Sequence, residues 1–179
     1  GLPVGTPAGN MALDIGGGNT ECAIVALNGI VIADSARVGG MALDQAIVTY
    51  VRKKYGIVIG EITAEEIKIR IGSAVPLDEV LAVEIQGRDH ITGLPRDAII
   101  TSEDVSEAID EPLEDIIAVA KSVLEKTPPE LASDAIDRGI VLCGGGSYLR
   151  GIEKRISSSV GVPAYLTDNP IGCVAVGAS

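Results

Sequence analysis

The sequence predicts an α/β fold with two subdomains, and three observations support this expectation. Short apolar runs typical of strands stand near both ends of the chain. Amphipathic helical patterns lie between them, as in crossover connections within one sheet. The middle of the chain is mostly helical and contains a single β-pair. We therefore expect a larger subdomain formed by residues 1–56 and 140–179, with residues 57–139 inserted as a smaller α+β subdomain.

The first strands are consecutive in the sequence. Residues 11–15 lead directly into three glycines, and residues 20–27 and 30–38 are joined by Asn28-Gly29. Asn-Gly between two β-rich runs is the strongest short hairpin signal, because a type I′ turn needs positive φ at both of its central positions. We expect a tight glycine turn followed by a β-hairpin.

Two helices are predicted next. Gly39-Gly40 precedes the first, at about residues 41–55, and Gly56 is a suitable C-terminal cap. The second helix is expected at about residues 63–71. Spacings of three and four residues place the apolar side chains of the first helix on one face. These residues are Leu43, Ala46, Ile47, Tyr50 and Val51.

The centre of the chain predicts a β-pair and a long helix. Short alternating runs between Val80 and Thr101 indicate the pair, and Ser102 with the acids after it is a favourable helix start. This helix is expected to reach about Lys126 and to end before Pro128-Pro129. Pro112 should kink or divide it, because proline has no amide hydrogen to donate.

The last third repeats a strand and helix alternation. Residues 139–143 form an apolar run that ends at three glycines, and a helix is expected at about residues 147–159. Residues 163–166 predict another strand, and Pro170 is placed to begin a final helix.

Composition limits the possible functions. Hydrophobic residues make up 46% of the chain and neither Phe nor Trp occurs, so the core must be aliphatic. A net charge of −11 argues against nonspecific binding of nucleic acid and against a basic membrane-binding patch, but not against ATP. The three cysteines, Cys22, Cys143 and Cys173, have no metal-ligand spacing and predict buried thiols in a reducing compartment. No signal peptide or spanning helix is visible, so we expect a cytoplasmic protein.

The first glycine motif has the pattern of a phosphate-binding loop. Successive glycines between two strands can direct several N–H groups at one anion. Asp14 stands at the strand end, where a carboxylate can hold Mg²⁺ through water, and Thr20 adds a hydroxyl group. The alternative is a glycine hairpin whose aspartate only caps the turn. The loop itself consists of Gly16, Gly17, Gly18 and Asn19.

The other motifs are weak when taken singly. A second glycine loop, formed by Gly144, Gly145 and Gly146, follows a buried strand and could let a ligand lie against the backbone. Gly39-Gly40 with Asp44 could be a flexible joint with an acid in the first turn of the helix. Glu65 and Lys68 are three residues apart on one helix, so they could form an ordinary solvated ion pair.

Together, these motifs resemble the actin-like ATPase superfamily. DIGGGNT at residues 14–20 is similar to its second phosphate loop, and GGMALD at 39–44 to its GGxxxD element. LCGGGSYLRG at 142–151 resembles the adenosine loop, and Glu65 with Lys68 resembles the ExxK helix. Within that superfamily, the sequence is similar to the bacterial MreB family over essentially all 179 residues.

The resemblance implies the second half of a four-subdomain actin-like ATPase, with a ribonuclease-H-like larger subdomain. It implies ATP and Mg²⁺ as cofactors, with Asp14 holding Mg²⁺ through water. It further implies filaments at the cytoplasmic face of the membrane, where they work with cell-wall elongation proteins. The phosphates would contact Gly16, Gly17, Gly18, Asn19 and Thr20, and the nucleoside Glu65, Lys68, Gly144, Gly145 and Gly146.

The same resemblance implies that this chain is a fragment. The family's first phosphate loop, the glutamate that positions the attacking water and the membrane-contacting elements would precede Gly1, so no catalytic residue is expected here. Asn19 stands where the family usually has Thr, and we expect binding to be retained because Asn can still donate a hydrogen bond. Two alternatives remain open: a DnaK-type chaperone ATPase, and a structural filament module whose nucleotide site has decayed.

Overall fold

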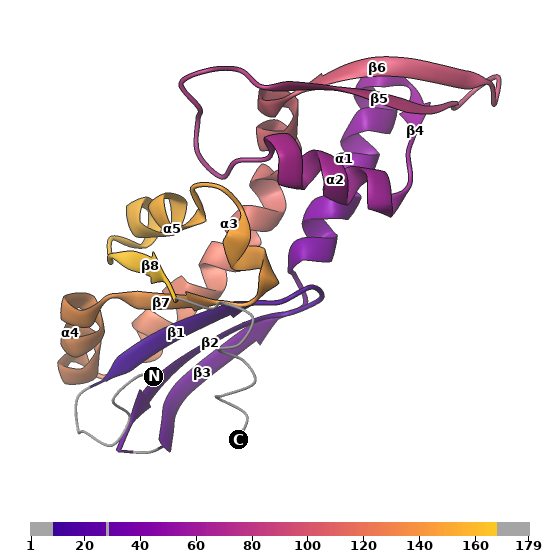
Figure 1. The fold of residues 1–179 in the computed structure, drawn as a ribbon. Helices are drawn as coiled ribbons and strands as arrows, with labels where there is room; N and C mark the ends of the chain where they lie inside the picture. The colour runs from indigo at the N-terminus through magenta and orange to yellow at the C-terminus, as the bar shows by residue number, and fades with distance from the viewer. Residues whose placement is uncertain (1–8, 28, 168–179) are drawn as a thin grey trace.

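The computed structural model describes residues 9–27 and 29–167, which build two β-sheets with helices between and beside them (Figure 1). The larger sheet has the strand order β3-β2-β1-β7-β8. β1, β2 and β3 pair antiparallel, whereas β7 pairs parallel with both β1 and β8. The strands are β1 (Asn10–Ile15), β2 (Thr20–Ala26), β3 (Gly29–Ala36), β7 (Ile140–Cys143) and β8 (Ala164–Leu166).

The smaller sheet contains the predicted β-pair. β5 (Ala82–Asp89) and β6 (Pro95–Thr101) are antiparallel, and β4 (Ile57–Val58) adds a third strand beside β5. Val83 and Ile85 are buried between exposed neighbours, as expected for a sheet with one face against a core.

Five α-helices and one 3₁₀ helix accompany the two sheets in the described part of the chain. Figure 1 shows α1 and α2 between the sheets, while the long α3 reaches from one sheet to the other. α3 contacts β6 of the smaller sheet and β2 and β3 of the larger one. The helices are α1 (Gly40–Tyr55), α2 (Glu61–Ile71), α3 (Ser102–Lys126), α4 (Pro129–Arg138), η1 (Gly145–Tyr148) and α5 (Ile152–Val160).

The core is aliphatic, as the composition predicts. Leu13 and Ile24 from the larger sheet, Ile47 from α1 and Ile116 from α3 are all at most 1% exposed. Each such side chain contributes about 1.5–3 kcal/mol through its removal from water. Because α3 packs on both sheets and on α1, it joins the two sheets through one aliphatic core.

The start of α3 shows how local sequence sets an element boundary. Thr101 is the N-cap: its hydroxyl accepts from the Asp104 N–H at 3.2 Å, and the Asp104 carboxylate accepts from the Thr101 N–H at 3.0 Å. α3 therefore begins at Ser102 and ends at Lys126, as predicted, with Thr101 as its N-cap. The expected division at Pro112 does not occur, because α3 continues to Lys126.

Other boundaries differ from the sequence prediction. The single helix expected at 147–159 is wrong: η1 and α5 are separate, because Gly151 between them has a φ of 73°. The prolines after α3 do more than end it, since Pro129 opens α4 at a favourable first position. The β2–β3 hairpin is confirmed, but Gly29 is already paired with Ala26 rather than lying in the turn.

Parts of the prediction lie outside the described residues. These are Asn28 of the hairpin, Cys173 and the helix expected from Pro170. Among residues 9–27 and 29–167, no helix is both long and apolar enough to cross a membrane.

Candidate functional site

The two glycine motifs meet at one edge of the larger sheet. Asp14 at the end of β1 is paired in register with Cys143 at the end of β7, and these strands are parallel. The glycine loop that follows each strand therefore leaves the sheet at the same edge, where α/β proteins commonly bind ligands. Each loop is recognisable in the sequence by itself, and the parallel pairing of β1 with β7 makes the two loops neighbours.

Close packing explains two of the three glycines after β7. Gly144 has a φ of 83°, and a β-carbon there would lie 2.4 Å from both Asp14 Oδ1 and the Ile15 carbonyl oxygen. A β-carbon at Gly146 would lie 2.3 Å from Ile15 Cγ2. Gly145 faces open space, with no atom within 4 Å of such a carbon. The flanking glycines thus bring the loop against β1, and the central one leaves an open surface.

The loop after β1 exposes backbone donors. The Gly16 N–H donates to the Asn19 carbonyl at 2.9 Å, which closes the turn. Gly17 and Gly18 are exposed, and their N–H groups donate to no other residue in the described ranges. The Asn19 side chain is engaged, because its amide donates to Glu21 at 2.9 Å. Free, exposed amides in a glycine turn suit an anion.

The Gly39-Gly40 element fastens this loop to α1. The Gly40 N–H donates to the Gly16 carbonyl at 2.9 Å, and the Met41 N–H donates to the Gly17 carbonyl at 2.8 Å. A β-carbon at Gly39 would lie 2.3 Å from the Gly16 carbonyl oxygen, so the approach is possible only without a side chain. The motif therefore holds the glycine loop by hydrogen bonds, in addition to connecting β3 to α1.

Thr20 braces the same loop. Its side chain is fully buried, and its hydroxyl donates to the Val38 carbonyl at 2.6 Å. That hydrogen bond ties the start of β2 to the segment that enters α1. The hydroxyl proton is thus already used within the protein.

Asp14 is the most unusual carboxylate at this edge. Its Oδ1 atom is buried and has no hydrogen-bond partner among residues 9–27 and 29–167. Burial raises the pKa of Asp14, and the nearby Glu21 carboxylate raises it further. An orphaned, destabilised carboxylate fits a bound cation or its water shell, which would supply the missing charge. In the described residues no group of three acidic, histidine or cysteine side chains could hold a metal alone, so a cation here would need other ligands.

Lys68 contacts the start of α1, beside the glycine loop, and the sequence did not predict these contacts. Its Nζ atom is 2.7 Å from Asp44 Oδ1 of α1 and donates to the Gly40 carbonyl at 3.2 Å. The ordinary Glu65–Lys68 ion pair is therefore not formed, and Glu65 is exposed without a hydrogen bond to a described residue. Asp44 was visible as part of GGMALD, but its partner depends on how α1 packs on α2.

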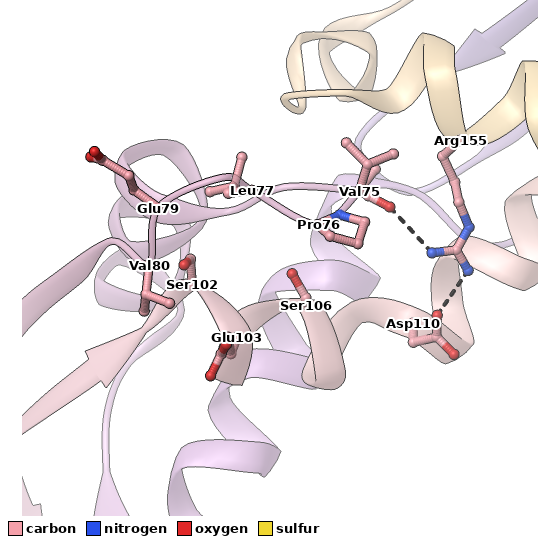
Figure 2. Close-up of a pocket in the computed structure, with 11 residues that line it drawn as sticks. Val75, Pro76, Leu77, Glu79, Val80, Ser102, Glu103, Ser106, Asp110 and Arg155 are labelled. Atoms are coloured by element: carbon pink, nitrogen blue, oxygen red, sulfur yellow. Dashed lines mark hydrogen bonds and ion pairs between the residues drawn. The ribbon is translucent and has the colours of Figure 1, made fainter.

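A cavity of about 300 Å³, lined by none of the glycines of the two loops, lies between residues 74–80, the start of α3 and Arg155 of α5 (Figure 2). Arg155 donates to Asp110 at 2.8 Å and to Glu114 at 2.7 Å, so its charge is already compensated. Glu79 and Glu103 also line the cavity. These carboxylates would repel phosphates, so this cavity does not suit a nucleotide.

Solved structures place this sheet and its two loops in a known class. Crystal structures of MreB5 of Spiroplasma citri, bound to ADP and to AMPPNP, are 37% identical in sequence and give TM-scores of 0.95 and 0.94. They match 99% of this chain and 54% and 53% of theirs. The MamK double helical filament, 21% identical with a TM-score of 0.72, covers 95% of this chain and 54% of its own and supports the fold alone. The protein thus has an actin-like fold.

The sequence comparisons give the family. The MreB/Mbl protein family model matches residues 1–179. The cell shape-determining protein MreB of Escherichia coli (strain K12) is 48% identical over 177 residues, which is 99% of this chain and 51% of that protein. The chain therefore belongs to the MreB/Mbl family, as the sequence motifs predicted, and the DnaK-type alternative is not favoured. The chain spans about half the length of the relatives it matches.

Proposed function

We propose that this chain forms the nucleotide-binding half of an actin-like cytoskeletal protein that determines cell shape and holds ATP with Mg²⁺. The observation that carries the proposal is the orphaned Asp14 Oδ1 atom, which lies where the two glycine loops meet. The nucleotides bound to the related MreB5 protein support the same conclusion.

Each group of residues in the site has a proposed role that follows from its chemistry. The exposed N–H groups of Gly17 and Gly18 donate to phosphate oxygens, in a turn that Gly16 and Asn19 close. Thr20 holds that turn in place through Val38. When bound, Mg²⁺ neutralises phosphate charge, and Asp14 holds its water shell.

The nucleoside is assigned to the second loop and to α2. The open space at Gly145, with Gly144 and Gly146 packed against β1, leaves backbone accessible to it. Glu65 and Lys68 would flank it from α2. Residues 57–139 then act as the smaller subdomain beside the ribonuclease-H-like subdomain of residues 1–56 and 140–179.

We further propose that the complete natural chain polymerises and hydrolyses ATP, with catalytic residues outside these 179. Bound ATP would favour the polymerising shape, and loss of the γ-phosphate would weaken it. The filaments would lie in the cytoplasm against the membrane and guide cell-wall elongation proteins, with membrane contacts made by regions outside this chain. The net charge of −11 does not favour nucleic acid as a partner.

The test compares Asp14→Ala with Asp115→Ala in the complete natural chain. Asp115 is an exposed aspartate on α3 and serves as the matched control. We expect Mg-dependent ATP binding by calorimetry and ATP-dependent sedimentation of filaments in the wild type and the control, and loss of both in Asp14→Ala. Filaments that form equally well without ATP and with Asp14→Ala would instead establish the structural module with a decayed site.

A further inference from the structure

Lys68 and Asp44 form a sheltered ion pair that joins α2 to α1. Nζ and Oδ1 are 2.7 Å apart, and the two side chains are only 16% and 11% exposed. Water screens such a pair far less than an exposed one, so its geometry is held more firmly. The contact with Asp44 is an ion pair without hydrogen-bond alignment, and the hydrogen bond of Lys68 goes to the Gly40 carbonyl at 3.2 Å.

Gly40 connects this pair to the glycine loop. Its carbonyl accepts from Lys68, while its N–H donates to the Gly16 carbonyl at 2.9 Å. The next residue, Met41, donates its N–H to the Gly17 carbonyl at 2.8 Å. A continuous set of hydrogen bonds therefore runs from α2, through the first residues of α1, to the exposed donors of the loop.

We propose that Asp44 is a positioning residue, which holds Lys68 against Gly40 so that α2 and the loop at Gly16–Asn19 move as one unit. The proposal rests on the proposed function, because it assigns the loop to phosphate binding. Without Asp44, the ammonium group of Lys68 would have one neutral carbonyl as its partner and would turn toward water. The first turn of α1 would then hold the loop less firmly, and the exposed donors at Gly17 and Gly18 would be less well placed.

The proposal differs from a role of Lys68 as a nucleoside contact alone. In that case Asp44 would affect binding only by placing the Lys68 ammonium group, and the N–H groups of Gly40 and Met41 would be unaffected. If the two residues act as a unit, loss of either one removes the same connection, and loss of both adds little. Hydrogen exchange at Gly40 and Met41 in Asp44→Asn thus distinguishes the two possibilities.

The first experiment measures the Kd for MgATP by calorimetry in the complete natural chain. The variants are Asp44→Asn, Lys68→Met and the double variant, and the matched controls are Asp115→Asn and Lys53→Met, at exposed positions. We expect each single variant to raise the Kd by about tenfold, the effect of losing one charged hydrogen bond, and the double variant to raise it no further. An Asp44→Asn value within twofold of its control would overturn the proposal.

The second experiment needs no nucleotide. Hydrogen exchange, read by mass spectrometry on a peptide that covers residues 39–43, reports the N–H groups of Gly40 and Met41. Exchange there should become about tenfold faster in Asp44→Asn and Lys68→Met and stay unchanged in β5, which separates a local effect from global destabilisation. Unchanged exchange at residues 39–43 would refute the connection. Absence of ATP binding in the wild type would refute only the proposed function, since exchange still decides the connection.

Discussion

The close approach of Gly39 to the glycine loop gives a prediction whose size follows from the geometry. In Gly39→Ala, the new β-carbon would lie 2.3 Å from the Gly16 carbonyl oxygen and 2.8 Å from that of Gly17. An ordinary contact of about 3.5 Å would require the loop to retreat by roughly 1 Å. The hydrogen bonds from Gly40 and Met41, now 2.9 and 2.8 Å long, would then exceed bonding distance.

Loss of these two hydrogen bonds should cost about 2 kcal/mol, at about 1 kcal/mol each. Gly60→Ala is the matched control, because Gly60 is likewise the N-cap of a helix but has no atom within 4 Å of the added carbon. Any change in capping preference is shared by both variants, so their difference isolates the clash.

The assay is urea unfolding of the complete natural chain with the wild type, Gly39→Ala and Gly60→Ala in parallel. We expect Gly39→Ala to be the less stable variant by about 2 kcal/mol and to bind MgATP more weakly. A difference below about 0.5 kcal/mol would show that the loop adapts to the methyl group without loss of its hydrogen bonds.

Three further outcomes follow from individual side chains. Burial alone would raise the pKa of Asp104, but hydrogen bonds from Lys54, Tyr55 and Thr101 lower it from 3.8 to about 2. The side chain is 4% exposed, so its contribution of about 2 kcal/mol should be complete above pH 4 and lost as the pH falls toward 2; unfolding of Asp104→Asn should depend less on pH in that window. Burial raises the pKa of Cys22 to about 12, so peptide mapping should find iodoacetamide on Cys22 at pH 8 only in denaturant, and modification of Cys22 in the native protein would contradict its burial. Thr20→Val should destabilise the protein by about 1–3 kcal/mol, because the buried Val38 carbonyl loses its donor, and thermal unfolding equal to that of the wild type would refute this role.

Local chemistry explains which elements could be predicted. The hairpin, α1 and the β5–β6 pair follow from short-range patterns: alternating apolar residues in the strands, and Gly56 at the end of α1 with a φ of 68°. The helix expected at 147–159 fails for a local reason too. A glycine inside an apolar pattern can either be tolerated or break the helix, and Gly151 breaks it by adopting a φ of 73°.

In the candidate site, too, the local motifs could be predicted from the sequence and the long-range contacts could not. The glycine loops are recognisable in the sequence because each motif is short and contiguous. Each depends on the conformational freedom of glycine itself, not on residues elsewhere in the chain. Their adjacency was not, because β1 and β7 are far apart in sequence and their parallel register is set by the sheet. The same holds for Thr20, whose hydroxyl could serve a ligand or the backbone until its contact with Val38 is known.

The sequence by itself determined the family, the aliphatic core, and the residue types that can hold an anion and a cation, since these are properties of composition and of contiguous motifs. Only the tertiary structure decided which side chains contact one another. It paired Lys68 with Asp44 rather than with Glu65, and it left Asp14 Oδ1 without a hydrogen bond beside Gly144. Ion pairing depends on interatomic distances of a few ångströms, and desolvation depends on how far a group is buried. Both are set by the packing of elements that are distant in the chain.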